Sequence, residues 1–254
     1  MSKKTPLYVV FEGGEGCYKS TTISNVFNEL TSLGFNVLQT KEPGTNHLPI
    51  TMKLREIVLD SSNADQLTPI ASELIKQAIR SIHIEKLIRP IYNSSEYDFI
   101  LQDRGQLSGR IYAEMLGVNQ VASSIVQLTT KNPISTKSPF SLSDLTIIMH
   151  RSDSNGLSIA KQAKKEFESG DCIESLGSEF HDGVNSLFKR CIPKQVSTHD
   201  ESYHNTLYKK AAWTNEIIGV NVQEYDNKQL ELSQTICEFL IEKYNDKTNS
   251  RKQD

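Results

Sequence analysis

The spacing of hydrophobic residues changes along the chain in a repeated order. A continuous apolar run at Leu7–Phe11 stops at two glycines, which predicts a buried strand that ends in a tight loop. From Lys19 to Leu33 apolar residues recur every three or four positions until Gly34, a pattern typical of an amphipathic helix with a glycine end. Val37–Thr40 then predicts a second strand. Together these elements predict a parallel βαβ unit, whose crossover is nearly always right-handed.

The same alternation of strand and helix patterns continues to the end of the chain. We expect a short helix around Leu54–Val58, a longer helix from Ile70 that stops near Pro90, strands at 97–101, 145–149 and 217–222, and a closing helix at 230–244. This order predicts a single doubly wound α/β domain over residues 1–254, with five strands and with ligands at the carboxyl ends of the strands.

Three polar segments fall outside this alternation. Residues 129–143 and 193–204 are rich in polar residues and predict surface loops. The tail at 245–254 is entirely polar or charged and is expected to fray as a disordered end.

Composition and charge exclude several classes of protein. Lys and Arg number 28 against 31 Asp and Glu, and the net charge of −3 lacks the broad positive field of a general nucleic-acid binder. The four cysteines are scattered and form no close pair, so neither a disulfide framework nor a zinc site is indicated. The first apolar run is too short for a signal peptide or a membrane span. We therefore expect a cytoplasmic protein without nucleic-acid or membrane partners.

A glycine-rich segment with the sequence FEGGEGCYKST lies at 11–21, between the first strand and the first helix. A loop in this position can cradle phosphate with its backbone N–H groups, place a Lys on the outer phosphates and a Ser/Thr hydroxyl on Mg²⁺. The candidate nucleotide-binding residues are Gly13, Gly14, Glu15, Gly16, Cys17, Tyr18, Lys19, Ser20 and Thr21.

One position departs from the phosphate-loop pattern. Gly13, Lys19 and Ser20 match G-x-x-x-x-G-K-[ST], but Tyr18 replaces the second glycine. A bulky side chain at a point of close approach either blocks the nucleotide or tilts outward. The competing interpretation is a glycine-rich turn followed by a solvated lysine, and the loop alone leaves these alternatives open.

Four segments in a fixed order resemble the thymidylate kinase family. They are FEGGEGCYKST at 11–21, TKEPGT at 40–45 with LR and LD shortly after it, QDRGQLSGRIY at 102–112, and DCIESLGSEF at 171–180. The last is similar to the mobile lid of that family. The likeness covers roughly residues 5–190, and four ordered segments are far more specific than any one of them.

The resemblance implies a P-loop nucleoside monophosphate kinase fold that transfers the γ-phosphate of ATP to dTMP or a related deoxynucleoside monophosphate. Such transfer depends on positioning and on neutralising phosphate charge. By resemblance, Lys19 reaches the outer phosphates of ATP and the Ser20 hydroxyl contacts Mg²⁺. Glu12 and Asp103 are expected around the metal and the acceptor phosphate. Arg104 is expected to clamp the monophosphate with its planar fork.

The resemblance also implies an acceptor site. Lys41 is a second candidate clamp on the monophosphate. Arg80 lies where the family's arginine contacts the thymine edge, Lys76 stands where the family has a stacking Phe, and Ser108 and Tyr112 match the family's third segment. Each has a simpler interpretation when taken singly, such as a solvated charge for Lys41.

Two further regions depart from the family pattern. Gly109 and Ala113 replace polar residues next to the acceptor site. In the predicted lid, at about 155–175, Cys172 replaces an arginine that would neutralise transition-state charge. Lys161, Lys164 and Lys165 either substitute for it or form a solvated helix face. Loss of such an arginine can lower the rate by about three or more orders of magnitude.

The sequence thus supports two hypotheses of different class. The first is a thymidylate kinase-like enzyme that uses ATP and Mg²⁺. The second is a catalytically degraded homologue that binds a nucleotide or a protein partner without transferring phosphate. Because family members are commonly homodimers, a homodimer is also expected. A P-loop ATPase acting on nucleic acid is disfavoured by the acidic charge balance.

Overall fold

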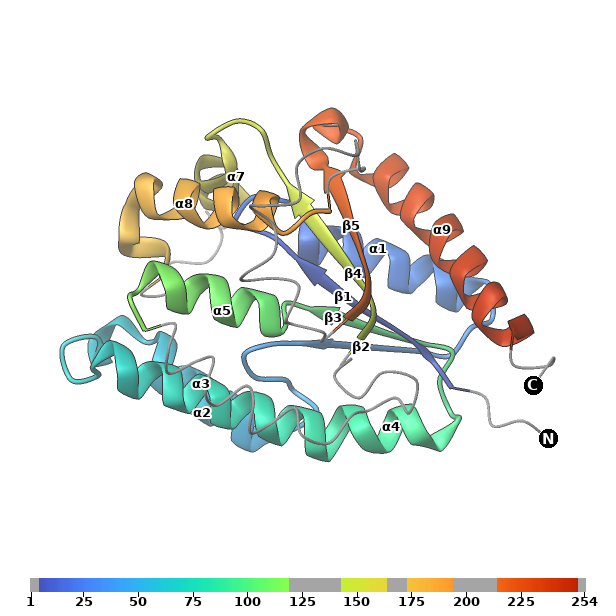
Figure 1. Cartoon of the computed structure of the whole chain (residues 1–254), viewed down its shortest axis with the longest axis horizontal. Coiled ribbons are helices and arrows are strands. Elements are labelled where there is room, and N and C mark those ends of the chain that lie inside the picture. The colour runs from blue at the N-terminus through green and yellow to red at the C-terminus, as the bar shows by residue number, and fades with distance from the viewer. Residues whose placement is uncertain (1–4, 119–142, 164–172, 194–213, 251–254) are drawn as a thin grey trace, which may run out of the picture.

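The computed structural model describes residues 5–118, 143–163, 173–193 and 214–250, which form a sheet with helices on both of its faces (Figure 1). The strands are β1 (Leu7–Glu12), β2 (Val37–Lys41), β3 (Phe99–Asp103), β4 (Ser143–His150) and β5 (Thr214–Asn221). They lie in the order β2-β3-β1-β4-β5, and every neighbouring pair is parallel. The prediction of a doubly wound α/β fold with five parallel strands is confirmed.

Alternate residues of the central strand face opposite layers of helices. Leu7, Val9 and Phe11 of β1 pack into one core cluster, with α1 (Lys19–Ser32) and α9 (Gln229–Ser250). Tyr8 and Val10 pack into the other, with η2 (Ile84–Ile88), α4 (Arg89–Ser94), α5 (Gln106–Met115) and α8 (Gly177–Arg190). Burial on both faces explains why β1 is a continuous apolar run. The remaining helices are α2 (Pro49–Leu59), η1 (Ser61–Asn63), α3 (Pro69–His83), α7 (Gly156–Ala163), η3 (Glu174–Leu176) and η4 (Val222–Tyr225).

Helical structure continues past Pro90, where the sequence predicted a stop. α3 passes into the π-helical segment η2 and then into α4, which is capped by Ser95. In a regular α-helix the proline ring clashes with the carbonyl group four residues earlier. Here Pro90 follows a wider π turn and lies in the first turn of α4, so the predicted stop is wrong.

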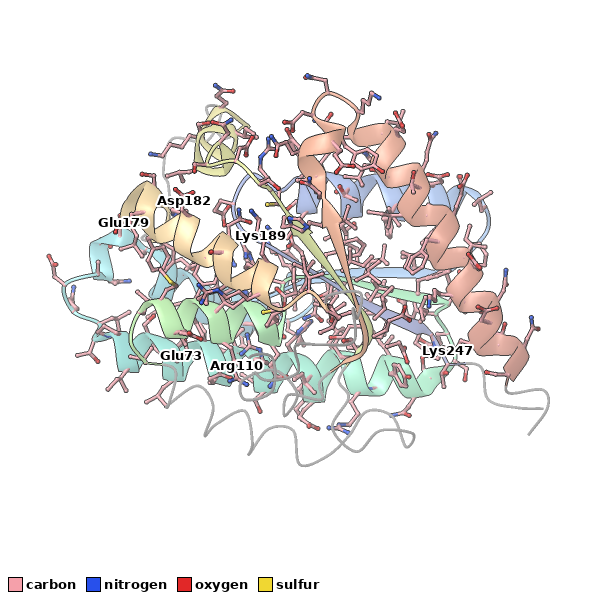
Figure 2. All side chains as sticks on the ribbon, turned by 45° about the horizontal axis from the view of Figure 1, so that its top comes forward. Glu73, Arg110, Glu179, Asp182, Lys189 and Lys247 are labelled. Atoms are coloured by element: carbon pink, nitrogen blue, oxygen red, sulfur yellow. The ribbon has the colours of Figure 1, made fainter. Side chains whose placement is uncertain are left out.

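The last helix is also longer than predicted. α9 runs to Ser250 rather than ending at Tyr244. Lys247, labelled in Figure 2, donates from Nζ to the Pro6 carbonyl oxygen at 2.7 Å and to Asp144 Oδ2 at 2.6 Å. These contacts anchor the last turns beside the start of the sheet. The predicted disorder of the tail is therefore wrong up to Ser250, and residues 251–254 lie outside the described residues.

The hydrophobic pattern did not predict α5 and α8. Each buries a short apolar face, formed by Leu107 and Ile111 in α5 and by Val184 and Phe188 in α8, and polar residues interrupt both faces. The predicted loops at 129–143 and 193–204 lie outside the described residues except at their ends. Among the described helices, none combines the length and apolar character needed to cross a membrane.

Candidate active site

The glycine-rich segment forms the loop between β1 and the start of α1, as predicted from the sequence. Backbone from another loop approaches it closely: a Cβ on Gly16 would lie 1.9 Å from the Gly156 carbonyl oxygen, and Gly16 has a φ of +69°. Only glycine tolerates both conditions. The loop leads directly into the first turn of α1, whose backbone N–H groups lack helical partners. This is the arrangement of a phosphate cradle.

Tyr18 stands at the loop position where the pattern has glycine, and its backbone is left-handed, with φ 54° and ψ 16°. This conformation is unfavourable for an L-residue with a bulky side chain. The Tyr18 hydroxyl donates to Asp226 Oδ1 at 2.7 Å, and the Arg151 guanidinium carbon lies 5.8 Å from the ring centroid. The ring is thus directed to the residues that follow β5.

Lys19, Ser20 and Asp103 meet where the loop enters α1. Lys19 is buried, and its Nζ donates to the Gly14 carbonyl oxygen at 2.6 Å. Burial lowers the pKa of Lys19, and the nearby charge of Arg104 lowers it further. The Ser20 hydroxyl donates to Asp103 Oδ2 at 2.7 Å. Asp103 Oδ1 is buried and has no hydrogen-bond partner among the described residues.

This pair of oxygen ligands fits Mg²⁺, which prefers oxygen atoms and takes few protein ligands besides water and substrate phosphate. An orphaned carboxylate oxygen beside a serine hydroxyl provides such ligands. Within the described ranges, no group of three or more His, Cys, Asp and Glu side chains could hold a metal on its own. The protein would therefore hold the ion through Ser20 and Asp103, with phosphate completing the shell.

Arg104 lies on the cleft side of the loop. Its NH1 donates to the Gly13 carbonyl oxygen at 3.0 Å, and its NH2 pairs with the Glu15 carboxylate. The guanidinium carbon lies 5.3 Å from the Tyr112 ring centroid. Burial lowers the pKa of Arg104, but Tyr112, Glu15 and Asp103 together raise it above its usual value. Arg104 is therefore a permanent cation at this position.

Glu12 lies behind the cleft rather than in its wall. It is 1% exposed, and its Oε1 accepts from the backbone N–H groups of Gly105 at 3.0 Å and Ser108 at 3.2 Å. The Ser108 hydroxyl donates to its other oxygen. Burial raises the pKa of Glu12. These contacts fix the start of α5, and with it the positions of Arg104 and Ser108.

A cleft of about 300 Å³ opens at the carboxyl ends of β1, β2 and β3. It brings together the predicted residues Glu15, Lys19, Ser20, Lys41, Lys76, Arg80, Asp103, Arg104, Ser108 and Tyr112. The other predicted loop residues do not line this cleft, and Cys17 packs into the hydrophobic core beneath the loop. With Arg55, the described walls carry six Lys or Arg side chains against three Asp or Glu side chains, so the cleft attracts anions.

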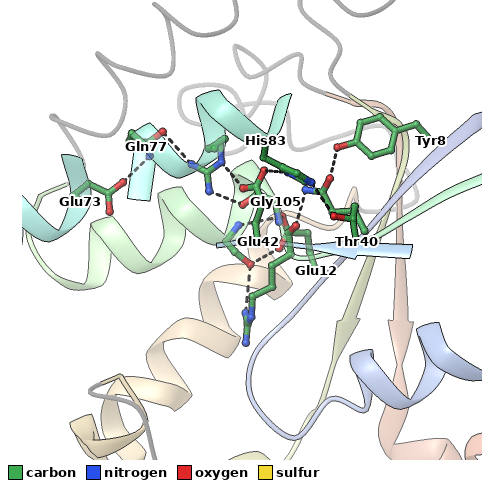
Figure 3. A network of polar contacts seen from close by, with 12 residues as sticks. Tyr8, Glu12, Thr40, Glu42, Glu73, Gln77, His83 and Gly105 are labelled. Carbon is green, nitrogen blue, oxygen red and sulfur yellow. Dashed lines mark hydrogen bonds and ion pairs between the residues drawn. The ribbon is translucent and has the colours of Figure 1, made fainter. Parts of the chain in front are cut away.

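Arg80 is held by a buried polar network that the sequence did not predict, and its partners Glu42, Gln77 and Gly105 are labelled in Figure 3. Its Nε donates to Glu42 Oε2 at 2.7 Å, its NH1 to Gln77 Oε1 at 3.0 Å and its NH2 to the Gly105 carbonyl oxygen at 3.2 Å. The other oxygen of Glu42 lies 3.0 Å from His83 Nδ1. Burial raises the pKa of Glu42, but Arg80 and His83 lower it more, to about 2.

Gly109 and Lys76, two positions that depart from the family pattern, both lie in the lining of the cleft. A Cβ on Gly109 would lie 2.6 Å from Arg80 NH2, so the absence of a side chain leaves room for the guanidinium. Lys76 Nζ lies 3.0 Å from Glu73 Oε2, and the Glu73 side chain is 1% exposed. Gln77 Nε2 donates to the other Glu73 oxygen at 2.6 Å. Lys76 is therefore oriented by a buried carboxylate.

Sequence reasoning missed several residues of this site. Glu73 and Gln77 were missed, although with the predicted Arg80 they recur every three or four positions on the buried face of α3, a polar stripe that could have indicated a network. No local signal in the sequence identified His83 as a partner of Glu42, or Arg151 as a neighbour of Tyr18. Of the residues predicted for a lid, Lys164, Lys165 and Cys172 lie outside the described residues, and Lys161 is exposed on α7.

Comparisons with known proteins agree on one family. No protein-family model matches the chain. The chain is 42% identical to the thymidylate kinase of Geotalea daltonii over 83 residues, which are 33% of this chain and 37% of that protein. It is 27% identical to the thymidylate kinase of Finegoldia magna over 189 residues, which cover 73% of this chain and 84% of that protein.

The similarity extends over most of the chain in sequence and in fold. The structure of thymidylate kinase from Candida albicans matches with a TM-score of 0.62 and 19% identity, over 95% of this chain and 93% of that one, which supports the fold. The thymidylate kinase of a Bradyrhizobium strain is 30% identical over 209 residues, which cover 79% of this chain and 87% of that protein. The chain therefore belongs to the thymidylate kinase family.

Proposed function

We propose that the protein transfers the γ-phosphoryl group of ATP to the 5′-phosphate of a deoxynucleoside monophosphate. The observation that carries this proposal is the cleft beside the phosphate loop, which is lined by four cations, Lys19, Lys41, Arg80 and Arg104, together with Asp103. Its volume of about 300 Å³ suits a small ligand. Membership of a family of nucleoside monophosphate kinases supports the same conclusion.

The proposed roles follow from the position of each group. Lys19 neutralises the outer phosphates of the donor, because its ammonium group lies inside the loop. Arg104, Lys41 and Arg55 hold the acceptor phosphate, since all three line the cleft. Burial and the charge of Arg55 lower the pKa of Lys41, which favours an anionic ligand between the two cations.

Mg²⁺ would be held by Ser20 and Asp103, where it would neutralise charge on the phosphate oxygens. On the cleft side, Arg104 would stabilise the negative charge of the transferred phosphate in the transition state. The contact of Arg104 with Glu15 keeps the guanidinium beside the phosphate loop. We assign α7, which carries Lys161, to a lid over residues 155–175 of a single domain.

Acceptor selectivity is expected to be broader than strict use of dTMP. Arg80 is engaged by Glu42, Gln77 and Gly105, and Lys76 supplies an ammonium group in place of an aromatic ring. A flexible ammonium group restricts the shape of a base less than a ring does. A coupled ADP-release assay with Mg²⁺ should detect another deoxynucleoside monophosphate that reacts within about tenfold of dTMP in kcat/KM, or faster.

The same assay tests the proposed function itself. Absence of turnover with every acceptor, in folded protein with Mg²⁺, would contradict it. Strict preference for dTMP would contradict only the broad selectivity. A second candidate function is that of a degraded homologue, which binds nucleotide without transferring phosphate. The observation that favours it is Tyr18, which stands at a glycine position of the phosphate loop. Stabilisation by ATP in a thermal-shift titration, without turnover, would support that alternative.

We further propose a homodimer formed through α2 and α3, which pack side by side. Four large apolar side chains on these helices are between 43% and 52% exposed: Ile50, Ile57, Ile70 and Leu74. Their grouping on two adjacent helices is typical of an association surface. Light scattering should give a dimer for the wild-type protein and a monomer for the double variant Ile57→Glu and Leu74→Glu.

A matched control for the dimer is Leu230→Glu, since Leu230 is 64% exposed on α9, in the opposite helical layer. This variant should remain a dimer. A monomeric wild-type protein would contradict the assignment. Among the cysteines in the described residues, Cys17 and Cys237 are free thiols, which supports a cytoplasmic location.

A further inference from the structure

The order of the strands separates two halves of the candidate site. The acceptor cleft lies over β2, β3 and the loop that follows β1. β4 and β5 lie on the other side of β1. In phosphoryl transfer the attacking and leaving oxygens lie roughly in line through the transferred phosphorus. Under the proposed function, on which this inference rests, the nucleoside of the donor therefore lies over the carboxyl ends of β4 and β5.

Three side chains connect the phosphate loop to that side of the sheet. The Tyr18 hydroxyl donates to Asp226 Oδ1 at 2.7 Å. Arg151, directly after β4, donates from NH1 and NH2 to the two Asp226 oxygens at 2.7 and 2.6 Å. We name Tyr18, Arg151 and Asp226 the tyrosine bridge. It spans from the residue before Lys19 to the connection between β5 and α9.

The bridge is held firmly on the strand side. Arg151 is 1% exposed, and its Nε and NH2 also donate to Asp153 at 2.8 and 3.0 Å. Asn185 donates to the Arg151 carbonyl oxygen at 2.9 Å. Hydrogen bonds from Arg151 lower the pKa of Asp226, so this carboxylate is ionised at neutral pH. Arg151 and Asp226 are therefore held in place by hydrogen bonds that do not involve Tyr18.

We propose that the tyrosine bridge occupies the path of the donor nucleoside, so that donor binding requires the Tyr18–Asp226 hydrogen bond to break. Tyr18 is then the residue that limits donor affinity, and it acts on the nucleoside rather than on the phosphates. A donor without a nucleoside, such as inorganic tripolyphosphate, reaches the phosphate loop without crossing the bridge.

The test compares wild-type protein with Tyr18→Phe, which keeps the ring and removes the hydrogen bond. Calorimetric titrations with Mg²⁺ and no acceptor measure Kd for the non-hydrolysable β,γ-imido analogue of ATP and for tripolyphosphate. Loss of a hydrogen bond to a charged group should tighten binding of the ATP analogue about tenfold and change tripolyphosphate binding less than about twofold. Tyr18→Gly, which removes the ring as well, should bind the ATP analogue at least as tightly as Tyr18→Phe does.

Tyr92→Phe is the matched control, because the Tyr92 hydroxyl lies 3.3 Å from Asp144 Oδ1, at the start of β4 rather than its end. It should bind both ligands like the wild type. Asp226→Asn, which weakens the same hydrogen bond, should act in the direction of Tyr18→Phe and gives a second readout if one variant misfolds. Unchanged or weaker binding of the ATP analogue by both variants overturns the proposal, as does an equal gain for tripolyphosphate.

The titrations need no acceptor, so the two proposals fail separately. If the protein transfers no phosphate but Tyr18→Phe binds the ATP analogue more tightly than the wild type, the bridge proposal stands and the proposed function is contradicted. An active enzyme whose Tyr18→Phe variant gains nothing contradicts the bridge alone.

Discussion

Replacing Lys19 with methionine is expected to lower kcat/KM for phosphoryl transfer by about three orders of magnitude, because the cation at the donor phosphates is lost. The fold should persist. Lys19 is 7% exposed, and burial disfavours its charged form, as its lowered pKa indicates. Methionine fills a similar volume without a buried charge. The thermal midpoint should therefore be equal to that of the wild type or higher, as measured by differential scanning calorimetry beside the coupled assay.

Lys86→Met is the matched control for Lys19→Met. Lys86 is exposed in η2, away from the lining of the cleft, and loses the same charge. Its kcat/KM and thermal midpoint should match those of the wild type. A Lys19→Met enzyme that keeps more than about a tenth of wild-type activity would show that the buried ammonium group is not the main cation of the donor site.

The strand ends of this site could be predicted from sequence because a parallel sheet brings them to one edge. Lys41 ends β2, Asp103 ends β3, and Lys19 follows the loop after β1. Once the apolar runs are recognised as parallel strands, these positions must converge. The sequence therefore located the cleft without any knowledge of side-chain contacts.

Partners that depend on tertiary packing could not be predicted. Glu42 meets Arg80 across 38 residues of sequence and His83 across 41. Nothing local distinguishes Glu42 in its turn from a solvated carboxylate. Glu12 shows the same limit, because it ends β1 where a metal ligand was expected, yet packs against the start of α5. A residue's place at a strand end predicts the edge it belongs to, but not whether it faces the cleft or the core.

Replacing Glu42 with glutamine is expected to lower the free energy of unfolding at pH 7 by about 3–5 kcal/mol, because it leaves the Arg80 charge buried without its counter-ion. Arg80 and Glu42 are each 5% exposed, so water cannot replace the lost partner without local opening. For a chain of this size the thermal midpoint should fall by roughly 10 °C. Urea unfolding and calorimetry measure the two quantities. Binding of the acceptor should weaken as well, since Arg80 lines the cleft.

Glu85→Gln is the control for that substitution, since Glu85 pairs with Arg89 at 2.9 Å but its side chain is 44% exposed. An exposed pair contributes little, and the free energy of unfolding should change by less than about 1 kcal/mol. If Glu42→Gln were equally mild, the buried network would not stabilise the fold.

The acid dependence of stability provides a further check on Glu42. Its pKa falls from 4.5 to about 2 in the folded protein, so the folded state binds its proton less readily than the unfolded state does. The stability that Glu42 contributes is therefore fully present above pH 4.5 and is lost as the pH falls toward about 2. Between pH 5 and pH 3 the wild-type protein should therefore lose stability more steeply than Glu42→Gln, and parallel urea-unfolding profiles of the two proteins over this range would contradict the ionised Glu42–Arg80 pair.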